Sequence, residues 1–210
     1  MGEAGDCGEF QFLQQASGVR FLARHLQHHQ VILDVYKRQD GSYLKLFRRK
    51  RLISSAAWYP YAQRFADNAL LLKERAIPCP AVTATYRIPA IKRDAVLYAP
   101  LEGRSLRQII RNGEDRSGLR TLLGHFVARL HAAGIYFRSL HLGNIVLSSA
   151  GTPGLIDIAD LRAGNRPLSR YWRRRNMQQL HKDPADHAWL CAGGSTEVDD
   201  AYRAAAGQDA

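Results

Sequence analysis

Apolar and polar residues follow a strand-like pattern early in the chain and a helix-like pattern later. Asp40-Gly41 is a strong turn signal, and three short segments after it predict strands: Ser42–Phe47, Thr83–Ile88 and Ala95–Tyr98. The polar Lys92-Arg93-Asp94 is expected to form the turn between the last two. Val31–Leu33 is the expected hairpin partner of the first strand.

Apolar residues at helical spacing predict three helices. The first is expected within Phe12–Leu26. The second presents Phe65, Ala69, Leu72 and Ala76 on one face and ends before Pro78. The third has an apolar stripe between Leu119 and Leu130 and stops at Gly134. Because strands come first and helices later, the chain is expected to be α+β.

The composition suits one globular unit. The chain has 210 residues, of which 46% are hydrophobic, enough to bury a core. Its three cysteines are Cys7, Cys79 and Cys191, and an odd number without paired short spacing argues against a disulfide framework and against a zinc site. We therefore expect a reducing, cytoplasmic setting. No apolar run approaches the roughly 20 residues that span a bilayer, so a soluble or peripherally attached protein is expected.

The chain is strongly basic, with a formal net charge of +11. Arginine and lysine gather in two runs, at Arg48–Arg51 and between Arg170 and Arg175. Such runs suit anionic membrane surfaces, phosphorylated glycans or nucleic acid, although each could equally be a solvated basic face. No aromatic-rich recognition motif accompanies them, so nucleic-acid binding ranks last.

A β-hairpin is expected near the middle of the second half. Ile145–Leu147 and Leu155-Ile156 are short apolar runs, and turn-forming residues separate them. An antiparallel hairpin brings Asn144 and Asp157 close together. A carboxylate beside a carboxamide suits magnesium with phosphates. The alternative is that both residues only cap the hairpin and bind each other or water.

Several motifs, in the correct order, resemble those of the protein-kinase superfamily. Phe137–Asn144 follows the catalytic-loop pattern H-R-D-L-x-x-x-N, and Leu155–Ala159 follows the strand and metal-binding aspartate of D-F-G. Leu97–Leu106 resembles the hinge between lobes, and Tyr43–Phe47 resembles the strand that carries the nucleotide-binding lysine. The match spans roughly residues 40 to 182. Within the superfamily the chain resembles the lipopolysaccharide-core kinases for heptose and Kdo, and Arg166–His181 resembles their C-terminal helix.

The resemblance implies a two-lobed protein-kinase-like fold. Residues 40–103 would form a short antiparallel β N-lobe with the hinge, and residues 104–210 a mainly helical C-lobe. The implied cofactors are ATP and Mg²⁺. The implied site consists of nucleotide-binding Lys45 and Glu102, metal-binding Asn144 and Asp157, and catalytic-loop Arg138, Ser139 and His141.

The sequence departs from the family at three points. Ser139 replaces the catalytic aspartate and Phe137 the usual histidine, and a serine hydroxyl cannot serve as an equivalent base. His141 is the nearest titratable group, and could act as the base or have a structural or substrate-contacting role. No glycine-rich loop precedes Lys45. Its acidic partner is also unassigned, with Asp67 and Asn68 nearest the expected place.

The segment Asp34–Gln39 raises a separate question. It resembles the translation of a transposon adapter used in library preparation, so residues 1–39 are treated as partly artefactual. The alternative is an ordinary polar segment that leads into the Asp40-Gly41 turn.

Together these features predict an ATP-dependent phosphotransferase that phosphorylates a sugar hydroxyl of an anionic glycolipid or phosphorylated sugar. The expected location is the cytoplasm, peripherally at the inner membrane of a Gram-negative bacterium. The alternative is a pseudokinase that binds nucleotide or acts as a scaffold, because Ser139 replaces the aspartate. The acceptor sugar and the oligomeric state do not follow from the sequence.

Overall fold

A computed structural model describes residues 35–48 and 59–207, in which short antiparallel sheets combine with six α-helices. The α+β class is thus confirmed. The helix expected within Phe12–Leu26 and the strand expected at Val31–Leu33 lie outside the described residues. Among the described residues, no helix has both the length and the apolar character needed to cross a membrane.

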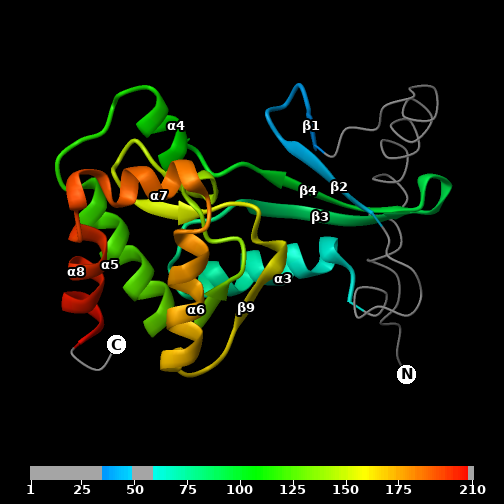
Figure 1. The fold of residues 1–210 in the computed structure, drawn as a ribbon. Helices are drawn as coiled ribbons and strands as arrows, with labels where there is room; N and C mark the ends of the chain where they lie inside the picture. The colour runs from blue at the N-terminus through cyan, green and yellow to red at the C-terminus, as the bar shows by residue number, and fades with distance from the viewer. Residues whose placement is uncertain (1–34, 49–58, 208–210) are drawn as a thin grey trace.

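Four antiparallel strands form the largest sheet (Figure 1). In spatial order they are β1 (Val35–Lys37), β2 (Tyr43–Arg48), β4 (Arg93–Ala99) and β3 (Ala81–Ile88). In the described residues the hairpin partner of β2 is therefore Val35–Lys37. The expected turn at Lys92-Arg93-Asp94 is shorter than predicted. A 3₁₀ turn at Pro89–Ile91 and a left-handed Lys92 reverse the chain, so Arg93 and Asp94 already pair with β2.

The alternation along β2 sends Lys45 to the inner face of this sheet. Leu44 and Leu46 are buried on the outer face with Ile88 and Ala95. Tyr43 stacks on Tyr98 of β4 on the inner face, with ring centroids 5.9 Å apart. Lys45 shares the face of Tyr43 and points inward, since its side chain is only 17% exposed.

Helix α3 (Tyr61–Glu74) packs against the inner face of the sheet (Figure 1). Its predicted stripe of Phe65, Ala69 and Leu72 is buried. Ala76 was wrongly placed on this face: it lies beyond the helix with φ of 52° and is exposed. The left-handed residue reverses the chain, so Ile77 enters the core instead.

The second half is mainly helical. Its helices are α4 (Leu106–Arg111), α5 (Leu119–Ala132), α6 (Arg170–Leu180), α7 (Pro184–Leu190) and α8 (Glu197–Ala206). Figure 1 shows α5 and α8 side by side, and a Cβ at Gly124 would collide with α8. Two small antiparallel sheets complete the half: β5 (Arg104–Ser105) with β7 (Ile145–Leu147) and β8 (Pro153–Leu155), and β6 (Ile135–Phe137) with β9 (Leu161–Ala163).

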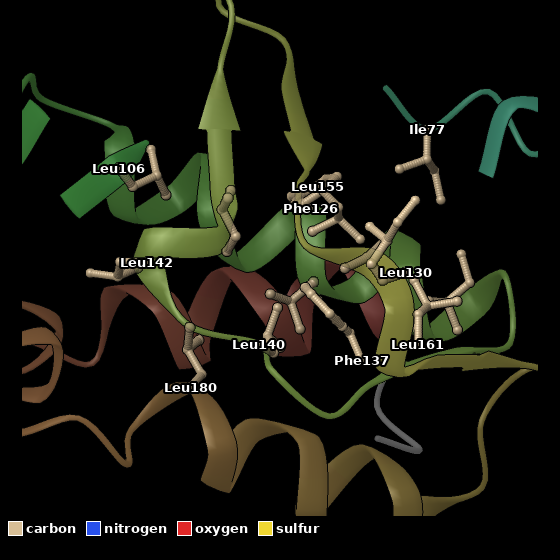
Figure 2. Close-up of a cluster of buried hydrophobic side chains, with 14 of the residues drawn as sticks. Ile77, Leu106, Phe126, Leu130, Phe137, Leu140, Leu142, Leu155, Leu161 and Leu180 are labelled. Carbon is tan, nitrogen blue, oxygen red and sulfur yellow. The ribbon is translucent and has the colours of Figure 1, made fainter. Parts of the chain in front are cut away.

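One hydrophobic cluster connects α3, α5 and the segment 137–144. Phe137, Leu140 and Leu142 are each at most 1% exposed. Figure 2 shows these side chains within the cluster, together with Leu130 of α5 and Leu180 of α6. The segment 137–144 is therefore anchored in the hydrophobic core by its own apolar residues.

Candidate functional site

The predicted hairpin forms and brings Asn144 and Asp157 to one edge. Ile145 of β7 pairs with Leu155 of β8, and the Ile156 N–H donates to the Asn144 carbonyl at 3.0 Å. Both Asn144 and Asp157 line a cavity of about 380 Å³. The antiparallel register alone accounts for their proximity.

This cavity, called the hairpin cavity below, lies between the large sheet and the β7–β8 hairpin. Strands β2 and β4 contribute Tyr43, Lys45 and Tyr98 to its lining, and the hairpin and the residues that flank it contribute Gly143, Asn144, Val146, Ile156 and Asp157. The remaining lining residues are Phe65, Pro80, Pro100, Leu101, Gly103, Ser105 and Gln108. Glu102 is exposed, and its neighbours Leu101 and Gly103 line the cavity instead. Gly103 adopts φ of 133° against the Leu147 carbonyl, where a Cβ would collide.

Lys45 and Asp157 form an ion pair across this cavity. The Lys45 ammonium Nζ lies 2.5 Å from Asp157 Oδ1, and the Asp157 side chain is 50% exposed. Asp157 has φ of 55°, a left-handed conformation that is uncommon outside glycine and concentrates at functional positions. Asp157 is thus the partner of Lys45 that the sequence left unassigned.

The two residues near the expected partner position have other roles. Asp67 accepts hydrogen bonds from Tyr59 and Gln63. Asn68 donates to the Ile158 carbonyl at 2.7 Å and so ties α3 to the residues that follow Asp157.

A second cavity, of about 330 Å³, also borders the ion pair. We call it the serine cavity. It shares Lys45 and Asp157 with the hairpin cavity and is otherwise lined by Leu46, Phe47, Arg48, Tyr61, Ser139, Ala159 and Asp160. The Lys45–Asp157 pair is therefore common to the walls of both cavities.

Ser139 has a carboxylate partner in the serine cavity. Its hydroxyl Oγ donates to Asp160 Oδ2 at 2.5 Å, and Asp160 Oδ1 is buried. Burial raises the pKa of Asp160, the charge of Asp157 raises it further, and the Ser139 hydrogen bond opposes both. Asp160 was not among the site residues expected from the sequence. The sequence signal that could have identified it is the Asp157-Ile158-Ala159-Asp160 motif, which has an aspartate at each end.

The other predicted catalytic-loop residues, Arg138 and His141, line neither cavity. Arg138 is exposed, and its charge acts on Asp160. His141 Nδ1 is buried, and burial, reinforced by the charge of Arg107, lowers the pKa of the ring. The role of His141 as a base stays a prediction, since Asp160 and not His141 contacts Ser139.

Two buried polar residues hold the 137–144 segment. Asp186 of α7 is 2% exposed, accepts the Leu142 N–H at 2.9 Å and is paired through both oxygens with Arg107. Asn176 of α6 is fully buried and bonds both the N–H and the carbonyl of Phe137. These bonds supply partners for backbone groups at both ends of the segment, so its backbone is positioned by α6 and α7.

The donor set at the hairpin edge fits a hard divalent cation beside phosphate groups. Asn144 Nδ2 donates to the Ser139 carbonyl at 3.0 Å, which leaves the amide oxygen as its ligand atom. Asp157 contributes an exposed carboxylate that already binds the Lys45 ammonium. Oxygen ligands of this kind are those that Mg²⁺ prefers.

Comparisons with known proteins add little to this geometry. No protein-family model matches the chain, and no curated protein sequence matches it. Among solved structures, monomeric WbdD is 14% identical with a TM-score of 0.46, covering 77% of this chain and 41% of that chain. WbdD bound to the kinase inhibitor LY294002 is 16% identical with a TM-score of 0.43, covering 78% and 42%.

A third structure, of the bifunctional kinase-methyltransferase WbdD, is 15% identical with a TM-score of 0.42, covering 79% of this chain and 45% of that chain. The chain thus spans less than half the length of these structures. At this level of similarity, activity must be argued from the chain's own residues.

Proposed function

We propose that the chain is an ATP-dependent phosphotransferase with a two-lobed protein-kinase-like fold, resembling the lipopolysaccharide-core sugar kinases. One observation carries the proposal: two cavities share the Lys45–Asp157 pair as part of their walls. A phosphoryl donor in one and an acceptor in the other would meet at that pair. Phosphoryl transfer depends mainly on such positioning and on charge stabilisation.

The hairpin cavity is the proposed nucleotide site. Lys45 Nζ, held on the inner face of the sheet, would contact the nucleotide phosphates, and Asn144 and Asp157 would hold Mg²⁺, since all three residues line this cavity. Bound Mg²⁺ neutralises negative charge on the phosphates during transfer. Glu102, at the connection between the sheet and α4, is proposed to contribute its backbone, because its side chain is exposed.

The serine cavity is the proposed acceptor site, and Ser139 with Asp160 replaces the single aspartate of the family. The acceptor oxygen forms a bond to the γ-phosphorus as the bond from that phosphorus to ADP breaks. Its proton passes to Ser139 Oγ while the Ser139 proton passes to Asp160 Oδ2. Serine alone is too weak a base, but the half-buried Asp160 carboxylate, with its raised pKa, completes the relay.

Basic and aromatic residues support an anionic glycolipid acceptor at a membrane surface. Arg48 lines the serine cavity. On α6, Tyr171 and Trp172 are 62% and 38% exposed among several arginines. Aromatic rings beside cationic groups suit the headgroup region of an anionic membrane. The membrane itself and the sugar carrying the hydroxyl belong to the proposal.

The test combines binding and transfer. Thermal stability is measured with and without Mg-ATP, and γ-phosphate transfer is measured with a dephosphorylated core oligosaccharide containing heptose and Kdo. Asp157→Ala should abolish the Mg-ATP-dependent stabilisation, whereas Asp200→Asn, an exposed aspartate on α8, should retain it. Absence of any Mg-ATP effect in the wild type would refute the nucleotide site.

A pseudokinase is the second candidate, and the serine at position 139 is the observation that favours it. Stabilisation by Mg-ATP without transfer to any acceptor, in both the wild type and Ser139→Asp, would select this alternative. A gain of transfer in Ser139→Asp would show instead that a missing base limits an enzyme.

A further inference from the structure

Three potential metal ligands meet where α6 ends and α7 follows. His181 is the C-terminal cap of α6, while His187 lies in α7 and Cys191 caps its end. Their ligand atoms all lie within 4.8 Å of one another. None of the three lines the hairpin cavity or the serine cavity, so the proposed phosphotransferase does not account for the cluster.

Two distances within this cluster are close to those around a single ion. His181 Nδ1 and His187 Nδ1 are 3.2 Å apart, and Cys191 Sγ is 3.9 Å from His187 Nδ1. Tetrahedral zinc, with bonds of about 2.0–2.1 Å to nitrogen and 2.3 Å to sulfur, places neighbouring ligand atoms about 3.3–3.6 Å apart. All three ligand atoms lie within 4.8 Å of one another, so small side-chain rotations would bring them to bonding distance of one ion.

The local fold sets this arrangement independently of an ion. His187 and Cys191 are four residues apart, so one helical turn places them on the same face. Asp183 caps α7 by accepting the N–H groups of Ala185 and Asp186, and this cap defines the turn that follows His181. Rigid elements of this kind position metal ligands better than a loop does.

We propose that His181, His187 and Cys191 bind a divalent transition metal ion of the zinc class. Two imidazoles and a thiolate form a borderline-soft set that selects such ions over Mg²⁺. His187 is exposed, so an ion can enter from solvent, and water completes a four-coordinate site.

The ion would join the two helices that hold the 137–144 segment. Asn176, which bonds Phe137, lies on α6, and Asp186, which bonds Leu142, lies on α7. A metal bond to His181 and another to His187 would therefore fix the spacing between the two anchors. The ion acts as a structural clamp, and its binding does not depend on nucleotide.

The experiment uses the full chain, stripped with EDTA and kept reduced, without nucleotide. Zn²⁺ affinity is measured by competition with a chromophoric chelator, and Co²⁺ is used as a spectroscopic probe. We expect one Zn²⁺ per chain, a thiolate-to-cobalt charge-transfer band, and a higher melting temperature with Zn²⁺. Cys191→Ser should weaken binding by at least about 100-fold, since even removal of an outer partner of a ligand costs 10–100-fold.

Matched controls separate this site from other thiols and imidazoles. Cys79→Ser and His125→Ala, the latter at an exposed position on α5, should bind Zn²⁺ as the wild type does. His187→Ala provides a second test, because an exposed residue can be replaced without disturbing the core. Equal Zn²⁺ affinity in His187→Ala, Cys191→Ser and the wild type would overturn the proposal. So would a cobalt spectrum without the thiolate band, which would leave only a hydrogen-bonded histidine pair.

Discussion

Asp157 and Asp160 are three residues apart, yet their environments differ. Asp157 is half exposed, adopts a left-handed conformation and pairs with the Lys45 ammonium at 2.5 Å. Asp160 is more deeply placed, has one buried oxygen and accepts the Ser139 hydroxyl. One carboxylate thus faces an ammonium group and the other a hydroxyl group.

This difference teaches that, under the proposed function, nucleotide binding and proton transfer would rest on separate groups. Lys45 contacts Asp157, and Asn144 contacts the backbone carbonyl of Ser139, so neither contact runs through the Ser139 side chain. Binding and catalysis should therefore respond to different substitutions.

The largest effect is expected from Asp186, which helps to position the 137–144 segment that contributes residues to both cavities. Asp186→Ala removes the acceptor of the Leu142 N–H and leaves Arg107 without its buried partner. We expect the free energy of unfolding to fall by about 3 kcal/mol. This value is at the lower end of the range for breaking a buried ion pair, because Arg107 is partly exposed. Denaturant unfolding measures it. Asp183→Asn, which keeps the α7 cap, should cost less than about 1 kcal/mol, and an equal loss in both variants would contradict this assignment.

The next largest effect should separate the two carboxylates. Asp160→Asn can still accept the Ser139 hydrogen bond but cannot accept a proton. We expect kcat to fall by about 100-fold or more while Mg-ATP affinity stays unchanged. Steady-state kinetics and calorimetric titration measure the two quantities. A parallel loss of nucleotide affinity would show that the cavities are not separable as proposed.

The pH dependence should also distinguish Asp160. Because burial raises its pKa, transfer should increase as pH rises through that raised pKa and the carboxylate ionises. Stability should change in the opposite sense. The folded state binds this proton more tightly than the unfolded chain, so Asp160's contribution is greatest at low pH and is lost as pH rises through the raised pKa.

The measurement compares pH profiles of kcat and of unfolding free energy for the wild type and Asp160→Asn. The variant should lose the acidic limb of the activity profile. An unchanged limb would assign it to another group.

The smallest effect concerns the rim of the hairpin cavity. Ser105 and Gln108 form a capping box at the start of α4 and also line this cavity. Ser105→Ala should reduce the free energy of unfolding by about 1 kcal/mol, as cap removal does, without changing the pH profile of transfer. Thermal unfolding tests the first part. Ser105→Asp, which retains a capping oxygen, should recover most of the loss.

Much of the fold follows from local sequence patterns. The alternation in Ser42–Phe47, the stripe in α3 and α5, and the turn formers between β7 and β8 predicted elements that the structure contains. The same patterns placed Lys45 on the inner face and brought Asn144 beside Asp157. These features could be predicted because side-chain period and antiparallel register are properties of neighbouring residues. Where local pattern failed, at Ala76, one left-handed residue ended the helix early.

By itself, then, the sequence determined the α+β class and the hairpin that brings Asn144 close to Asp157, whereas Lys45 entered the expected site through the family resemblance. Only the tertiary structure decided that Asp157 pairs with Lys45, 112 residues away, that Asp160 supports Ser139, and that two histidines meet Cys191. Each of these contacts depends on how separate elements turn and pack against one another. The local residue pattern does not specify these contacts, because the burial and orientation of each side chain are set only when the core packs.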